Sequence, residues 1–237
     1  MIVDVFVLSV ADNRDADADA EGVLAPDELA RATRLRDPSL RAGYRVAHVL
    51  LRRQIARRLK QDPACLQFAR EACPLCDGPH GRPYVDNAAV SFSLSHSGDL
   101  VVIAQTDHGA IGVDVEATIS ARDVATLDCA LHPQEAAELA RLPERVLPQA
   151  ITANWCRKEA YLKALGCGLG KDPAGVLVGP GPGATRMGGH EDPWLVTSLD
   201  VPAGYACALA VSGWALPEVS FGDEPARCST VAPRVAG

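Results

Sequence analysis

Two adjacent β-rich runs constrain the fold of this chain more than any other feature of its sequence. Residues 90–97 read VSFSLSHS and residues 100–106 read LVVIAQT, and a Ser-Gly-Asp turn signal separates them. The segment IGVDVE at 111–116 follows a His-Gly pair and has the pattern of a third strand. We therefore expect consecutive strands in the middle of the chain.

Further strand and helix patterns lie on both sides of these runs. In chain order we expect a strand at 2–9, an acidic loop to about Pro26, helical turns at 27–36, a basic helix at 39–60, a Cys/Pro/Gly-rich loop at 73–83, a helix opened by Pro133, a helix at about 149–165 that ends at Gly166, a flexible loop at 179–189, two closing strands (WLVTSL and YACALAV) and a loosely held tail after Pro217. Strands alternate with helices in both halves, which indicates an α/β or α+β protein whose two lobes meet near residue 110.

Length and composition exclude two broad classes of protein. The chain has 237 residues, a formal net charge of -7 and 48% apolar residues, which is typical of one large or two small globular domains. No run approaches the roughly 18 apolar residues that cross a bilayer, so a membrane-spanning chain is excluded, and the globular composition excludes a wholly disordered one. The apolar start carries Asp4 and lacks a basic region, which favours a buried strand over a secretory signal. We therefore expect a cytoplasmic location.

The cysteines predict reduced thiols rather than a disulfide framework. There are eight of them in a chain long enough to bury its own core, and no export signal accompanies them. The only spacing typical of a metal site is Cys73-Pro-Leu-Cys76 with His80 four residues later. A structural zinc site normally has a second ligand pair, so a tight turn is favoured here and zinc is the alternative.

Positive charge is concentrated in one block. Residues 31–60 hold ten Arg and Lys side chains and a single acid. In the helix expected there, Arg41, Arg45, His48 and Arg52 fall on one stripe, which would suit a polyanion. A solvated helix face is an equally good interpretation. Nucleic acid is a weaker option, because the block has few aromatic residues and the rest of the chain is acidic.

Two segments carry residues suited to phosphate chemistry. On a strand, Asp114 and Glu116 share one face, and paired carboxylates of this kind suit Mg²⁺, although alternating acids are also common on exposed strands. Later, Trp155, Glu159 and Lys163 recur every four residues and so line one helix face. They form either an ordinary Glu–Lys helix pair or a third carboxylate and an ammonium for a metal-bound pyrophosphate.

These two segments together resemble the larger, monomeric class of 4′-phosphopantetheinyl transferases, the type that activates surfactin synthetase. The hallmark strand G-(V/I)-D-x-E stands at 112–116, and the hallmark helix W-x-x-K-E-A-x-x-K-A-x-G-x-G-L stands at 155–169. The arginine-rich helix, Gly81-Arg82-Pro83 and Ser95-His96-Ser97-Gly98 resemble the family in the same order. The resemblance covers roughly residues 30–210.

The resemblance implies a fold and an activity. The fold would be an α+β pseudo-dimer of two similar lobes, 1–110 and 111–216, each a small, mainly antiparallel sheet packed with helices, with residues 217–237 as the tail. The activity would be transfer of the phosphopantetheine arm of coenzyme A to a serine of acyl or peptidyl carrier proteins, releasing adenosine 3′,5′-bisphosphate. Coenzyme A would lie between the lobes of a monomer, with neither nucleic acid nor membrane as partner. The alternative is a non-catalytic binder of coenzyme A or a nucleotide with the same fold.

The resemblance also implies roles for single residues. Asp114, Glu116 and Glu159 would hold Mg²⁺, and Glu159 would take the serine proton directly or through a metal-bound water. Glu135 is the second choice of base, although a glutamate at the third position of a helix also stabilises the helix start. Lys163 and, less surely, Lys158 would bind the pyrophosphate. The remaining expected contacts to the co-substrate are Arg36, Arg41, Arg45, Arg82, Ser95 and His96.

Overall fold

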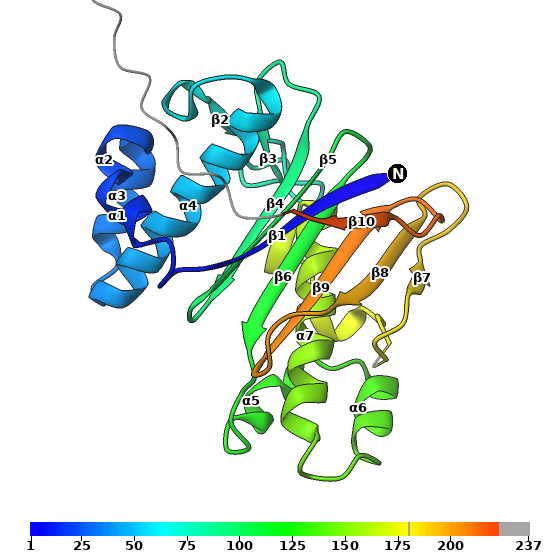
Figure 1. Ribbon diagram of the computed structural model, residues 1–237. Coiled ribbons are helices and arrows are strands. Elements are labelled where there is room, and N and C mark those ends of the chain that lie inside the picture. Colours follow the sequence, from blue (N-terminus) through cyan, green and yellow to red (C-terminus); the bar gives the residue numbers. More distant parts are fainter. Residues whose placement is uncertain (180, 223–237) are drawn as a thin grey trace, which may run out of the picture.

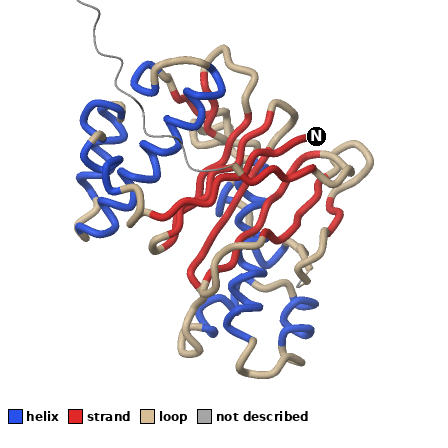
Figure 2. Tube along the Cα trace, viewed as in Figure 1, coloured by secondary structure: helices blue, strands red, loops and turns tan. Residues whose placement is uncertain are grey.

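The structure, a computed structural model that describes residues 1–179 and 181–222, contains two four-stranded sheets (Figures 1 and 2). The first has the order β10-β1-β5-β4, formed by Glu218–Phe221, Ile2–Ser9, Leu100–Thr106 and Ser91–Ser97. The second has the order β6-β9-β8-β7, formed by Ile111–Ala117, Tyr205–Ser212, Trp194–Leu199 and Thr185–Met187. A small sheet pairs β2 (Phe68–Arg70) with β3 (Pro83–Val85). Every pairing is antiparallel except β10 with β1, which confirms the α+β prediction.

Each large sheet carries its own helices (Figure 1). The first lobe has α1 (Arg14–Ala18), α2 (Ala20–Val23), α3 (Pro26–Arg34) and α4 (Pro38–Leu59), and the second has α5 (Val124–Leu127), α6 (Pro133–Leu139) and α7 (Leu147–Leu165). Short 3₁₀ turns lie at Pro63–Cys65, Asp128–Ala130, Gly168–Gly170 and Pro173–Gly175. Within the described ranges, no helix has both the length and the apolar composition to cross a bilayer. Internal similarity of the two lobes stays a prediction.

The long helix α4 is defined by its two ends. The Asp37 carboxylate accepts hydrogen bonds from the backbone N–H groups of Ser39 (2.7 Å) and Leu40 (3.2 Å), and Pro38 occupies the first helical position. Its last turn closes on Lys60, which takes the left-handed conformation with φ 55°. Between these ends, an apolar face packs against the first sheet and forms the core of that lobe.

The arginines of α4 are largely neutralised inside the protein. The segment after β1, expected to be an acidic loop, instead forms α1 and α2 and lies against α4. Arg45 pairs with Asp17 (Nε–Oδ1, 2.7 Å) and with Glu21 (Nη1–Oε1, 3.0 Å), and Arg53 pairs with Asp19. Arg45 of the basic stripe therefore binds an acidic segment of the same chain. That the stripe as a whole meets a polyanion stays a prediction.

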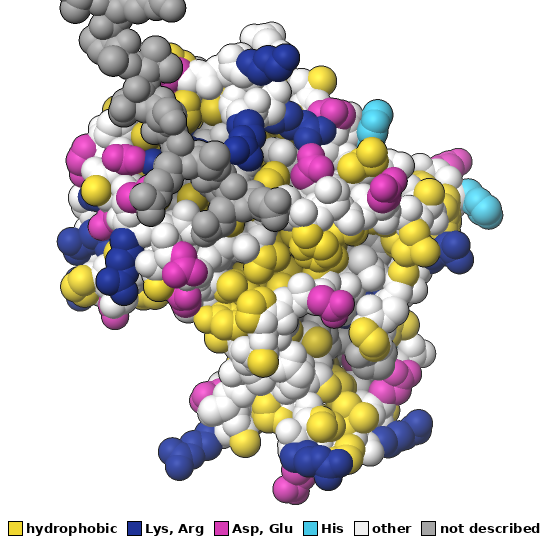
Figure 3. All heavy atoms as spheres, in the orientation of Figure 1, with side chains coloured by type: hydrophobic (Ala, Val, Ile, Leu, Met, Phe, Trp, Pro, Cys, Tyr) yellow, Lys and Arg dark blue, Asp and Glu magenta, His cyan; other side chains and the backbone are white. Residues whose placement is uncertain are grey.

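The faces of the two sheets that point away from their helices share one apolar cluster. It includes Val3 and Val102 of the first sheet and Val113, Val115 and Leu209 of the second, all almost completely buried. On the face drawn in Figure 3, hydrophobic side chains gather where the two lobes meet. Burial of apolar surface contributes about 25 cal/mol per Å², so this cluster stabilises the contact between the two sheets.

Serines on β4 connect the edge strands of the two sheets. The Ser93 hydroxyl accepts a hydrogen bond from the Val113 backbone N–H (3.0 Å), and the Ser97 hydroxyl accepts one from the Ala117 N–H (3.0 Å). Strand β6 is an edge strand, so these N–H groups have no partner in its own sheet. The alternating serines of SFSLSHS thus satisfy the free edge of β6 and fix its position beside β4.

The C-terminal segment is more ordered than expected. Residues 218–221 form β10 and pair in parallel with Ile2–Val5 of β1, so the part of the tail that directly follows Pro217 belongs to the first sheet. The prediction of a loosely held tail from residue 217 is therefore wrong for residues 218–221. The remainder of the predicted tail, residues 223–237, lies outside the described residues.

Helix α7 approaches β6 so closely that a side chain at Gly112 would not fit. A Cβ atom there would lie 2.1 Å from the Ala160 carbonyl oxygen and 2.6 Å from the Ala164 nitrogen. Because both are backbone atoms of a buried helix, relief of the clash requires movement of α7 itself.

We predict that Gly112→Ala lowers the free energy of unfolding by about 2–3 kcal/mol, because the added methyl group overpacks the strand–helix contact. Urea denaturation of the variant and the wild-type chain measures this change. Gly175→Ala is the matched control, since a Cβ atom at Gly175 meets nothing within 4 Å. Equal stability losses in the two variants would contradict the explanation.

Candidate functional site

The two carboxylates of β6 lie under α7, as their spacing predicts. Ile111, Val113 and Val115 point into the apolar cluster between the sheets. By the alternation of a strand, Gly112, Asp114 and Glu116 point the other way, toward α7. The close approach at Gly112 therefore places both acids beneath the helix that carries Glu159 and Lys163.

Lys163 links the helix to the strand. Its Nζ atom donates to Asp114 Oδ1 at 2.6 Å, to the Ser95 hydroxyl at 3.1 Å and to the Val113 carbonyl at 3.3 Å. The Ser95 hydroxyl in turn donates to Asp114 Oδ1 at 2.9 Å. The Asp114 side chain is 3% exposed and that of Lys163 is 30% exposed, so the pair joins a buried anion to a cation that reaches the surface.

One oxygen of the Asp114 carboxylate lacks a hydrogen bond of ordinary geometry within the described part of the chain. This oxygen, Oδ2, is buried, whereas Oδ1 accepts two hydrogen bonds, and the Cys156 thiol also interacts with the carboxylate. A buried carboxylate oxygen without a donor is unfavourable unless a cation or a proton binds it. This unpaired oxygen, next to two further carboxylates, is what a site for a hard divalent cation provides.

The two neighbouring glutamates show the same deficit of positive charge. Burial raises the pKa of Glu159, and the charges of Asp114 and Glu116 raise it further, while Lys163 acts in the opposite direction. Burial likewise raises the pKa of Glu116, although the Ser97 hydroxyl donates to its Oε2 at 2.7 Å. The three carboxylates therefore repel one another, and a divalent cation among them would relieve that repulsion.

The carboxylates do not form a closed ligand set by themselves. Among residues 1–179 and 181–222, the only Cys, His, Asp and Glu side chains whose ligand atoms all lie within 4.8 Å of one another are Cys73, Cys76 and His80. At the carboxylates, the Lys163 ammonium supplies the positive charge on Asp114. The donor set fits Mg²⁺, which keeps several waters and uses only one or two direct carboxylates.

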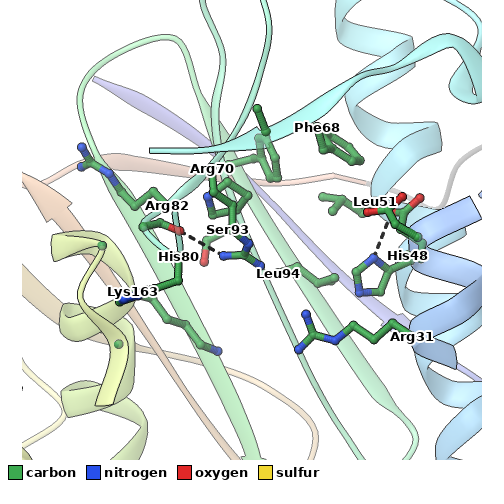
Figure 4. A pocket seen from close by; sticks show the side chains of 18 of the residues that line it. Arg31, His48, Leu51, Phe68, Arg70, His80, Arg82, Ser93, Leu94 and Lys163 are labelled. Carbon is green, nitrogen blue, oxygen red and sulfur yellow. Dashed lines mark hydrogen bonds and ion pairs between the residues drawn. The ribbon is translucent and has the colours of Figure 1, made fainter. Parts of the chain in front are cut away.

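A cavity of about 790 Å³ opens beside this cluster and is lined by both lobes. Its walls come from α3, α4, the β2–β3 segment, β4 and the end of α7 (Figure 4). The positively charged or titratable bases that line it are Arg31, His48, Arg70, His80, Arg82, His96 and Lys163. In Figure 4 the ends of Arg31, Arg70 and Lys163 point toward the same space. Apolar walls formed by side chains such as Phe68 and Leu94 complete a pocket suited to a large anion with an organic part.

Two acids, Asp27 and Glu28, lie in this pocket wall, and Glu28 is already paired. Glu28 binds the buried Arg52 (Nε–Oε2, 2.7 Å) and His48 (Nδ1–Oε1, 3.2 Å). Burial alone would raise the pKa of Glu28, but the hydrogen bonds from His48 and the Ala25 N–H and the charge of Arg52 hold it below the ordinary value. The three arginines and Lys163 therefore outnumber the acids of the wall.

Ser95 and His96 take different parts of the site, since successive residues of a strand point to opposite faces. Ser95 is buried and binds Asp114 and Lys163. His96 lines the cavity, and burial together with the positive charges of His48 and Lys163 lowers its pKa. The lowered pKa favours the neutral imidazole of His96.

Of the four arginines expected to contact the co-substrate, one lies at the pocket. Arg82 lines it, donates to Glu71 Oε2 at 2.8 Å, and holds the Ala164 carbonyl of α7 at 3.0 Å. Arg36 is exposed outside the cavity lining, Arg41 donates to the Leu35 carbonyl at 3.1 and 2.9 Å, and Arg45 is paired with Asp17 and Glu21. Arg41 and Arg45 thus serve as contacts within the first lobe, and none of the three lines this cavity, so their contact with the co-substrate stays a prediction.

Lys158 and Glu135 form a buried ion pair at 2.7 Å, and neither side chain has any exposed surface. Lys158 also donates to the carbonyls of Pro173 (2.8 Å) and Val176, and Glu135 accepts from the N–H groups of Val178 (2.8 Å) and His132 (3.0 Å). These contacts leave no free donor or acceptor for a ligand. The roles expected for Lys158 at a pyrophosphate and for Glu135 as a base stay predictions, and the contacts here are those of a structural ion pair.

Sequence reasoning missed Arg31 and Arg70 as pocket residues, whereas His48 was expected on the basic stripe of α4. Arg31 belongs to the basic block but matches no motif, and Arg70 lies on the short strand β2, which was not expected. Only the packing of β2 and β3 beside α4 brings them to one cavity. No spacing in the sequence signals that arrangement.

Comparison with known proteins connects this geometry to a family. Residues 110–210, which hold β6, α7 and the second sheet, match the family model of the 4′-phosphopantetheinyl transferase superfamily. All three carboxylates and Lys163 lie inside the matched segment.

Curated relatives extend the match. The 4′-phosphopantetheinyl transferase HetI of Nostoc sp. is 30% identical over 158 residues, or 65% of this chain and 64% of the relative. A putative 4′-phosphopantetheinyl transferase of Synechocystis sp. is 31% identical, over 63% of this chain and 59% of the relative, and the 4′-phosphopantetheinyl transferase gsp of Aneurinibacillus migulanus is 32% identical over 38% and 37%. The matched part thus spans less than two thirds of the length of these relatives. Through residues 110–210 and these relatives, the chain is similar to members of the 4′-phosphopantetheinyl transferase superfamily.

Proposed function

We propose that the protein transfers the 4′-phosphopantetheine arm of coenzyme A to a serine hydroxyl of an acyl or peptidyl carrier protein. The observation that carries the proposal is Lys163, which both lines the cationic cavity and contacts Asp114 of the carboxylate cluster. A pyrophosphate bound at the end of this cavity would meet a fixed ammonium on one side and a potential metal site on the other. This is the arrangement that phosphoryl transfer requires.

The cavity suits coenzyme A in charge and size. The co-substrate carries a 3′-phosphate and a pyrophosphate, and Arg31, Arg70 and Arg82 can offer planar, multiply donating groups to such oxygens. A volume of about 790 Å³ lies within the range of cofactor pockets. The apolar wall formed by Phe68, Leu94 and their neighbours suits the parts of the ligand that carry no charge.

Asp114, Glu116 and Glu159 would hold Mg²⁺, with the unpaired Oδ2 of Asp114 as one ligand atom. When bound, the ion would neutralise charge on the pyrophosphate and make the bisphosphate a better leaving group. Lys163 would neutralise negative charge from the protein side. The buried pair of Lys158 and Glu135 would have a positioning role, since it holds the Pro173–Gly175 turn and the residues after it against α7.

In the transfer, the serine oxygen of the carrier attacks the phosphorus atom next to the pantetheine arm. A new P–O bond forms to that oxygen, the P–O bond to the other phosphate breaks, and adenosine 3′,5′-bisphosphate leaves. We propose that Glu159 accepts the serine proton, because burial and neighbouring carboxylates raise its pKa and so make it a stronger base than an ordinary glutamate. The proposal retains a monomeric, cytoplasmic enzyme whose partners are carrier proteins.

We predict that Glu159→Gln lowers the transfer rate by about 10²–10⁴-fold, because the amide cannot take a proton and binds a cation weakly. The assay mixes the protein, coenzyme A, Mg²⁺ and an apo carrier protein, and follows the mass increase of the carrier by mass spectrometry. Glu138→Gln, at an exposed glutamate of α6, is the matched control and should keep the wild-type rate.

The same experiment tests the non-catalytic alternative. If the wild-type protein binds coenzyme A in a calorimeter but modifies none of a panel of fatty-acid, polyketide and nonribosomal-peptide carriers, the proposed transfer is wrong and the protein is a binder. If some carriers are modified, the panel also identifies the preferred class.

Substitution of two lysines of α7 tests ligand binding and folding stability separately. We predict that Lys163→Met weakens coenzyme A binding at least about 10-fold, because it removes a cation of the pocket wall. Lys158→Met instead lowers the free energy of unfolding by about 3–5 kcal/mol, because it leaves Glu135 buried without its partner. Calorimetry at low temperature, where both variants stay folded, and urea unfolding measure the two effects. A loss of affinity confined to Lys158→Met would contradict these assignments.

The raised pKa values of Glu116 and Glu159 predict a pH-dependent effect of Mg²⁺. A carboxyl group whose pKa is higher in the folded state lowers stability as pH rises through that pKa, and a bound cation offsets the loss. We therefore expect about 10 mM Mg²⁺ to raise Tm by about 2–5 °C at pH ~7.5 and by less at pH ~5, where protons compete with the ion.

Thermal melts at constant ionic strength, with K⁺ in place of Mg²⁺ as the reference, measure this difference. The double variant Glu116→Gln/Glu159→Gln should lose the Mg²⁺ effect at both pH values. A shift in Tm of the same size in the wild type and the double variant would show that Mg²⁺ acts elsewhere.

A further inference from the structure

A second cluster of ligating side chains lies at the rim of the cavity, outside the carboxylate site. Cys73, Cys76 and His80 offer two sulfur atoms and one ring nitrogen that all lie within 4.8 Å of one another. The Cys76 Sγ and His80 Nε2 atoms are 3.1 Å apart. The β2–β3 segment that carries them also supplies His80, Gly81 and Arg82 to the cavity wall (Figure 4).

Backbone hydrogen bonds hold these side chains together. The Cys73 N–H donates to the Gly78 carbonyl at 2.8 Å, and the Cys73 carbonyl accepts from the N–H groups of Cys76 (3.3 Å) and Asp77 (2.9 Å). The His80 N–H also donates to the Gly78 carbonyl, at 2.8 Å. The turn is therefore closed on both sides of Gly78, and the ligand atoms face one another before any ion binds.

Gly78 is required for this convergence. A Cβ atom at this position would lie 2.9 Å from His80 Cδ2, 3.0 Å from His80 Nε2 and 3.4 Å from Cys76 Sγ. The imidazole thus occupies the space that any other residue at 78 would fill. The expected tight turn is present, but it has the specific shape that lets a histidine approach two cysteines.

We propose that Cys73, Cys76 and His80 bind one Zn²⁺ ion, with water in the fourth position. Two thiolates and an imidazole are ligands typical of zinc, whereas Mg²⁺ prefers oxygen, so this site and the carboxylate site select different metals. Cys76 and His80 are exposed while Cys73 is buried, which leaves one side of the cluster open to water. The seven cysteines in the described ranges are free of disulfides, so the thiols are available.

The metal would fasten the loop to the second lobe. Cys73 packs into the apolar cluster of α7 and the second sheet, with Cys156, Ala160 and Cys167 among its members. A few residues on, Gly81 contacts the chain before Cys73 through its N–H bond to the Glu71 carbonyl (2.9 Å), and Arg82 binds the Ala164 carbonyl. An ion that joins Cys73 to Cys76 and His80 would therefore hold the cavity wall, including Arg82, against α7.

Metal content tests the proposal without any reference to transfer activity. The protein is purified without chelators or added metal, and its zinc is measured by inductively coupled plasma mass spectrometry. We expect about one Zn²⁺ per chain in the wild type and less than about one tenth of that in Cys76→Ser and His80→Gln. Both substituted residues are exposed, so circular dichroism should show that the variants remain folded. Cys65→Ser and Cys129→Ser, at other exposed cysteines, are the matched controls and should keep the metal.

Cobalt provides a second readout of the ligands. Replacement of Zn²⁺ by Co²⁺ should give thiolate charge-transfer absorption in the wild type and both controls, and reduced absorption in Cys76→Ser. Wild-type protein that is folded, free of zinc and without this absorption would overturn the proposal. So would a Cys73–Cys76 disulfide found by mass spectrometry in protein purified under reducing conditions, or full zinc content in His80→Gln.

Discussion

The site depends on the close contact between β6 and α7, which only a residue without a side chain at 112 permits. A larger residue there would collide with the backbone of α7 at Ala160 and Ala164. With glycine, the strand places Asp114 and Glu116 under the one helix face that carries Glu159 and Lys163. The chemistry is thus set by backbone packing. The carboxylates meet because two apolar surfaces meet, and their mutual repulsion is overcome by the burial of the strand and helix around them.

The negative charges of the carboxylate site are only partly compensated by the protein itself. Lys163 and Ser95 satisfy one oxygen of Asp114, while the other oxygen and the two glutamates remain short of positive charge. Two other buried carboxylates are matched by a cation, Glu135 by Lys158 and Glu28 by Arg52. The carboxylates of this site, in contrast, lack a full complement of positive charge. Such selective incompleteness is typical of functional sites, where burial shifts pKa values toward those needed for chemistry.

The sequence predicted the central strands, the two long helices and the site face of β6, because each rests on a local rule of strand or helix geometry. The sequence-based predictions failed where the interaction partner of a charged side chain had to be identified. Arg45 was placed with a phosphate, but the acids of α1 and α2 a few dozen residues away were equally good partners. Lys158 adjoins Glu159 in sequence, yet one residue turns about 100° around a helix, so it points to the buried Glu135. Arg31 and Arg70 were missed because only the packing of separate segments brings them together.

Lys163 is the point at which the two halves of the site are coupled. Its ammonium is bonded to the buried Asp114 and also lines the cavity, so an anion in the cavity and a cation at the carboxylates act on the same charge. A cation bound to Asp114 would compete with the ammonium for the carboxylate, and an anion in the cavity would attract the released ammonium. Binding of the cation and binding of the anion therefore favour each other, and this coupling requires no movement of β6 or α7. If both ligands bind as proposed, their affinities must be coupled in the positive sense, because each strengthens the interaction that the other leaves unsatisfied.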